Sequence, residues 1–77
     1  MEITETTKIQ FKVMDTTDDK HEGELITHIG PVTPGSTVSF KDVTIDVEKV
    51  QWVDAKTVKL VSSNYIAVLE VVNVLEA

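Results

Sequence analysis

The alternation of apolar and polar residues along the chain predicts a protein built from β-strands. In residues 8–13, Ile9, Phe11 and Val13 alternate with polar residues, which is the period of a strand with one buried face. The chain also contains thirteen Val and ten Thr, whose branched side chains favour strands over helices. We therefore expect an all-β fold that starts with a half-buried strand.

The middle of the chain predicts short strands separated by sharp changes of direction. Residues 25–29 form a second apolar segment, which should end at the two prolines of residues 30–35 because proline cannot donate to a ladder. A third strand opens with Val38 and Phe40 inward. Its alternation changes phase at residues 41–42, where a bulge is the simplest explanation, and again at 48–49. Either a strongly bent strand or two short strands would fit this pattern.

The longest nearly continuous apolar run, residues 65–75, follows a predicted hairpin of residues 50–53 and 57–61. We interpret the run as a strand that is apolar on both faces, with Glu70 interrupting one face and Asn73 the other. A helix is the competing interpretation, since Tyr65, Val68, Leu69, Val72, Leu75 and Glu76 would share one stripe. The density of valine favours the strand.

These elements predict a single domain, residues 1–77, with about six antiparallel strands. A small antiparallel barrel or a compact sandwich fits this pattern, and an SH3-like or OB-like barrel fits the length. A domain of this size buries only about 60% of the surface of its unfolded chain, so its core is small. With no Cys available for disulfides, we expect self-association to supplement it.

The C-terminal run suggests where that self-association would occur. One face of the strand would pack inside the domain and the other would form an interface between copies. If the odd-numbered face is the outer one, then Leu69 and Val71 contact the partner, and lysine at either position should disrupt association more than folding. The run is too short for a membrane helix, and the first residues do not resemble a secretory signal, so we expect a cytoplasmic protein without membrane contact.

Charge narrows the range of partners. Seven lysines, no arginine and thirteen acidic residues give a net charge of −6. Arginine is the usual residue for bidentate contacts to phosphate and guanine, so this composition argues against nucleic-acid binding. We expect the partner to be another protein with a basic surface.

The densest polar cluster, around residues 15–24, supplies the candidate contact residues Asp15, Asp18, Asp19 and Glu22. Read as a calcium loop from Asp15, the sixth position is Lys20 and the twelfth is Ile26, where glycine and glutamate are needed. We therefore expect a solvated acidic turn and no metal. His21 and His28 lack the further ligands of a zinc site, and each is expected at the surface or on an edge strand.

No pattern in the chain predicts catalysis or a cofactor. The serines lack a glycine-flanked elbow, there is no cysteine nucleophile, and three glycines cannot supply a phosphate-binding loop. Of the two remaining aromatic residues of interest, we expect Trp52 in the core and Tyr65 at the surface, where Tyr65 is a further candidate residue for contact with a protein partner.

The leading hypothesis is a non-enzymatic protein–protein interaction module, acidic and self-associating. Such chains are compatible with virus- or plasmid-encoded inhibitors that bind a basic host protein. The alternatives are a structural assembly subunit, such as a viral or phage component, and a carbohydrate-binding module that uses Trp52 or Tyr65.

Overall fold

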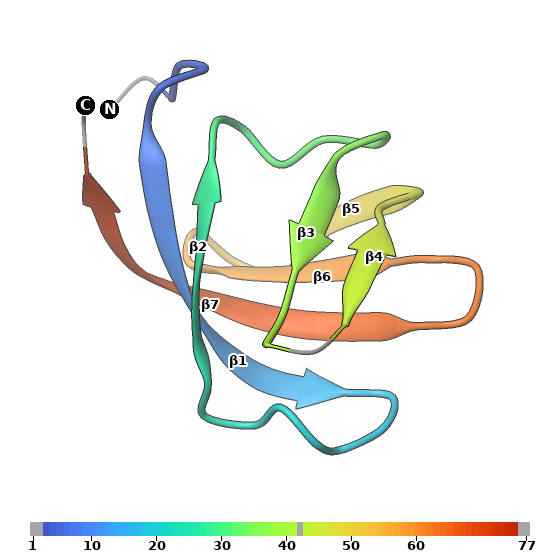
Figure 1. Cartoon of the computed structure of the whole chain (residues 1–77). Helices are drawn as coiled ribbons and strands as arrows, with labels where there is room; N and C mark the ends of the chain where they lie inside the picture. The colour runs from blue at the N-terminus through green and yellow to red at the C-terminus, as the bar shows by residue number, and fades with distance from the viewer. Residues whose placement is uncertain (1–2, 42, 76–77) are drawn as a thin grey trace.

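The structure, a computed structural model that describes residues 3–41 and 43–75, is an antiparallel β fold (Figure 1). Five strands form one sheet in the order β2-β1-β7-β6-β5, and β3 pairs with β4 in a separate two-stranded sheet. The large sheet contains β1 (Lys8–Thr16), β2 (Leu25–Ile29), β5 (Lys49–Trp52), β6 (Thr57–Val61) and β7 (Ile66–Leu75), and the small one β3 (Thr37–Ser39) and β4 (Thr44–Asp46). No helix long and apolar enough to cross a membrane occurs in these ranges.

The C-terminal run is the central strand of the large sheet. β7 pairs with β1 on one side and with β6 on the other, so the strand interpretation of this run is confirmed and the helical one is wrong. The first half of β7, up to Glu70, pairs with β6 on one side, and residues 67–75 pair with β1 on the other, so backbone groups on both sides of the first half have partners. The valine-rich sequence therefore forms a strand that lies between β1 and β6.

A bulge in β7 overturns the expectation that its polar residues fall on opposite faces. Phe11 pairs with Val71 but Gln10 pairs with Asn73, so Val72 is an extra residue and the alternation reverses there. Glu70, opposite Lys12, and Asn73, opposite Gln10, consequently lie on the same outer face. The inner face is apolar throughout its described length, with Ala67, Leu69, Val71 and Val74.

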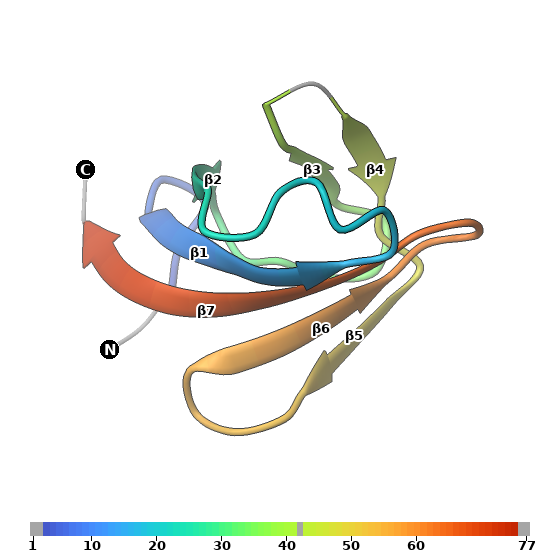
Figure 2. The same cartoon turned by 90° about the horizontal axis from the view of Figure 1, so that it is seen from below.

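The β3–β4 hairpin covers the inner face of the sheet. In Figure 2 the hairpin lies on one side of the β2–β1–β7 portion, and its apolar side chains complete the core. The core contains no charged residue among its buried members, which are Ile9, Phe11, Val13, Ile26, Val38, Phe40, Ile45, Val47, Val58, Leu60, Ala67 and Leu69. The predicted inward positions Val38 and Phe40 are confirmed.

Three details differ from the sequence-based expectations. The predicted phase change at residues 41–42 lies between the two strands of a hairpin, and residue 42 itself lies outside the described residues. The described residues therefore form seven strands where about six were expected. Bulges occur instead within the β1–β7 pairing. Trp52, expected in the core, is 51% exposed, because it ends an edge strand that pairs only with β6 among the described strands.

Candidate functional site

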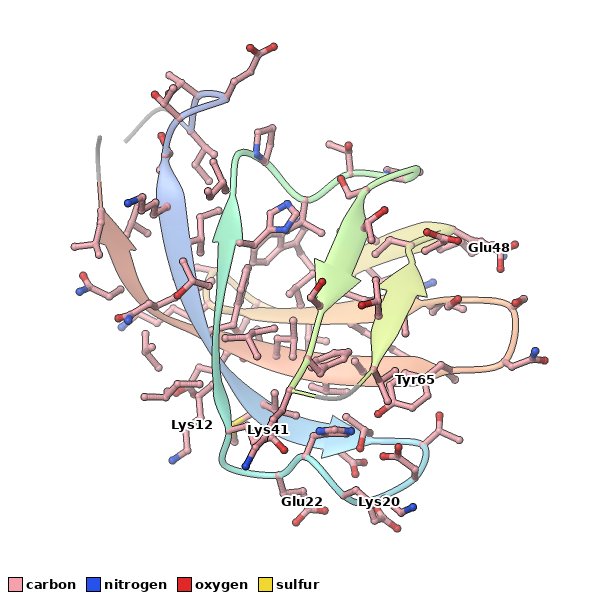
Figure 3. The ribbon with its side chains drawn as sticks, viewed as in Figure 1. Lys12, Lys20, Glu22, Lys41, Glu48 and Tyr65 are labelled. Carbon is pink, nitrogen blue, oxygen red and sulfur yellow. The ribbon has the colours of Figure 1, made fainter. Side chains whose placement is uncertain are left out.

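The loop between β1 and β2 is organised around the carboxylate of Asp18. Its Oδ1 accepts hydrogen bonds from the Thr16 hydroxyl at 2.8 Å, from the Lys20 backbone N–H at 3.2 Å and from the Tyr65 hydroxyl at 2.9 Å. Tyr65 directly precedes β7, and Figure 3 shows its side chain directed toward this loop. The structure thus brings together two predicted contact residues, Asp18 and Tyr65, that are 47 positions apart.

His21 is buried within this loop, contrary to its expected place at the surface. Only 2% of the residue is exposed, and its ring stacks on Phe40 with a centroid distance of 5.4 Å. Its Nδ1 lies 2.8 Å from the Glu24 carboxylate, and its Nε2 lies 3.7 Å from that of Asp18. Phe40 in turn contacts Tyr65, so these residues form one cluster, which we call the His21 cluster: Asp18, His21, Glu24, Phe40 and Tyr65.

The His21 cluster also shifts the ionisation of Asp18. Desolvation of the carboxylate raises the pKa of Asp18, but hydrogen bonds from Thr16, Lys20 and Tyr65, together with the charge of His21, lower it by more. The net effect is a pKa below the ordinary value, which keeps Asp18 ionised as a hydrogen-bond acceptor. Because the imidazole is buried, stacked and bonded to Glu24, the cluster fixes the loop against the core and gives a solute no access to the ring.

Three further acidic residues, one near the end of β1 and two in the loop, are exposed to solvent. Asp15, Asp19 and Glu22 are exposed, and one carboxylate oxygen from each lies within 4.8 Å of the other two. This is the one described group of carboxylates close enough to share a cation, although exposed acidic groups often cluster without one. Asp19 holds a positive φ of 54°, which aspartate tolerates in turns.

The other predicted contact residues, Leu69 and Val71, face the interior. Leu69 is 0% exposed and Val71 packs against the core, so the odd-numbered face up to the bulge is the inner one. Their assignment to an interface between copies is therefore wrong. The outer face of the sheet instead carries lysines: Lys8 and Lys12 on β1, Lys49 on β5 and Lys59 on β6.

Sequence reasoning missed the exposed apolar residues on the two free edges of the large sheet. On β2, Leu25 is 65% and Ile29 is 60% exposed; on and after β5, Trp52 is 51% and Val53 is 67% exposed. The β2 edge also borders an open hollow of about 360 Å³, whose other wall is formed by Ser39, Phe40 and Lys41. The segment of residues 25–29 contains no charged residue, and that signal could have identified it as an unprotected edge.

No family model, curated protein or solved structure matches this chain in the comparisons with known proteins.

Proposed function

We propose that this protein is a small, non-enzymatic domain that binds another protein. The observation that carries the proposal is the free edge of β2, where two large aliphatic side chains stand in solvent on an ordered strand without a charge. Proteins usually protect such edges with lysine, proline or a bulge, because unpaired backbone groups attract further strands. An uncovered edge that lacks these devices is a surface suited to a partner.

The acidic loop supports a partner with a basic surface. Asp15, near the end of β1, and Asp19 and Glu22, in the loop, are exposed, and they bring three negative charges close together. A cationic partner would relieve this repulsion and would be steered toward the loop. We keep the inhibitor of a basic host protein, virus- or plasmid-encoded, as the proposed biological setting, and the cytoplasm as the proposed location because the chain has no Cys.

We also propose a partly open barrel as the finer description of the fold. The small hairpin of β3 and β4 faces the inner side of the large sheet, and the gap between β2 and β3 would be the opening. A sandwich would require a larger second sheet than the two short strands described.

Affinity capture from the native host with matched variants tests the proposal. The immobilised wild-type chain should retain a defined protein, and the double substitution Leu25→Lys with Ile29→Lys should retain much less of it. Val53→Lys, which adds a charge at an exposed valine on the opposite edge, is the control and should bind as wild type. If no protein is enriched, or if the edge variant retains it equally well, the proposal is wrong.

A second candidate function, a structural assembly subunit, is favoured by the presence of two unlike free edges. A chain with exposed apolar residues at both β2 and β5 could pair with a neighbour on each side, and unlike contacts of this kind build open arrays. Light scattering over a concentration series distinguishes the two functions. Mass that grows without limit supports assembly, whereas a fixed small species supports the binding module.

A further inference from the structure

We propose that the β2 edge binds the same edge of a second copy, so that two chains pair antiparallel around Thr27. This inference rests on the proposed binding function, in which the β2 edge accepts a further strand, and assigns that strand to a second copy of this chain. In such a pair, Thr27 faces its own counterpart and Leu25 faces Ile29 of the other chain. The two large exposed side chains of each edge would then cover each other.

The backbone of β2 presents the groups that this pairing needs. The Gly30 N–H donates to Thr7 and the Glu24 carbonyl accepts from Val13, which directs the backbone groups of the even-numbered residues toward β1. Because these directions alternate in an antiparallel pair, the N–H and C=O groups of Leu25, Thr27 and Ile29 point to the free edge. In the described residues β2 pairs with β1 alone. Three residues therefore offer a ladder that is symmetric about Thr27.

The hollow beside β2 lies where the strand of the second copy would run. It borders Glu24, Leu25, Ile26 and Thr27, which is the N-terminal half of the strand, and residues 39–41 form its far wall. In an antiparallel pair centred on Thr27, the C-terminal half of the partner strand lies beside this N-terminal half. The C-terminal half of β2 in each chain, which contains Ile29, would thus enter the hollow of the other chain.

Charge does not oppose the pairing. Residues 25–29 are free of acidic and basic groups other than His28, and the neighbouring positions on β1 are Lys12 beside Leu25 and Lys8 beside Ile29. Each lysine is separated from the lysines of the other chain by two intervening strands. The acidic loop is not needed for this contact, so dimerisation should change little with salt, in contrast to an association between acidic loop and lysine-bearing face.

Sedimentation equilibrium on the full chain tests the inference. The wild type should show a reversible dimer, and Thr27→Lys should weaken it by about tenfold or more because two lysines then face each other across the axis. Gln51→Lys adds the same charge on exposed β5 and should leave dimerisation unchanged. Circular dichroism should show that both variants remain folded, since both positions are exposed.

Cross-linking tests the register, because the chain has no cysteine of its own. A mixture of Leu25→Cys and Ile29→Cys chains should form disulfide-linked dimers on mild oxidation, and each variant alone should form far fewer. A monomer at all concentrations, or a dimer insensitive to Thr27→Lys, would overturn the inference. If the chain does not dimerise but host capture still depends on Leu25 and Ile29, the binding function stands and a strand of the host protein occupies the β2 edge. If neither dimerisation nor host capture depends on this edge, the proposed binding function is wrong as well.

Discussion

At the scale of single residues, burial and hydrogen bonding separate side chains that look alike in the sequence. Asp18 and Asp19 are adjacent, yet Asp18 accepts three hydrogen bonds from its own chain while Asp19 points into solvent. His21, flanked by charged residues, is buried because stacking on Phe40 and bonding to Glu24 compensate its removal from water. Asp18 is thus a structural residue, and the exposed members of the loop remain the candidates for partner contact.

The lowered pKa of Asp18 predicts a pH dependence of folding. A carboxyl whose folded pKa is depressed contributes stability above its unfolded pKa, and this contribution is lost as pH falls through the folded value. Asp18→Asn should therefore be less stable than wild type near neutral pH, and the difference should shrink as the pH drops below the ordinary range of aspartate. Urea unfolding at a series of pH values measures this.

A matched substitution controls that measurement. Asp15→Asn removes the same charge from an exposed aspartate near the end of β1, and its effect on unfolding should be small at every pH. If Asp18→Asn and Asp15→Asn change the unfolding free energy equally, the hydrogen-bonded role of Asp18 is contradicted.

At the scale of elements, β7 determines how the sheet is organised. It pairs with β1 on one side and, up to Glu70, with β6 on the other, and its inner face is apolar. The extra residue Val72 reverses its alternation, so Glu70 and Asn73 share the outer face. The edge strands β2 and β5 are the opposite case, because each pairs with a single strand in the part of the chain that the structure describes and carries exposed apolar residues. The central strand therefore stabilises the fold, and the edges are where partners can attach.

Substitutions in β7 and next to β5 should show this contrast. Leu69→Ala empties a fully buried position of the central strand and should cost about 2–5 kcal/mol of unfolding free energy. Val53→Ala, at a residue that is 67% exposed, should change stability by no more than about 0.5 kcal/mol. Chemical denaturation of the two variants makes the comparison, and equal losses would contradict the position of Leu69 in the core.

At the scale of the whole molecule, charge is divided between two regions. Asp15, near the end of β1, and Asp19 and Glu22, in the following loop, form an exposed acidic group, whereas the outer face of the sheet carries four of the seven lysines together with Glu70. The net charge of −6 therefore does not describe a uniformly acidic surface. Two such regions could also attract each other between copies, and only this mode of association should weaken steeply with salt.

Repulsion among the neighbouring carboxylates of Asp15, Asp19 and Glu22 should lower the stability of the protein at low ionic strength. Glu22→Gln removes one of three neighbouring negative charges and should stabilise the protein slightly at low ionic strength. The gain should disappear in high salt, where exposed charges are screened. Thermal unfolding at two salt concentrations measures the effect, with Glu5→Gln, an exposed residue outside the cluster, as the control. An equal gain from both variants would attribute the effect to net charge alone.

The sequence by itself determined the β class, the first strand, the β5–β6 hairpin and the strand character of residues 66–75, because each depends on local alternation and on β-branched side chains. Only the tertiary structure decided which face of β7 is inner, since the bulge at Val72 arises from pairing with β1. It also decided that His21 is buried, that Trp52 is exposed, and that β2 is left as an edge. Each of these depends on neighbours distant in sequence, which periodicity does not record.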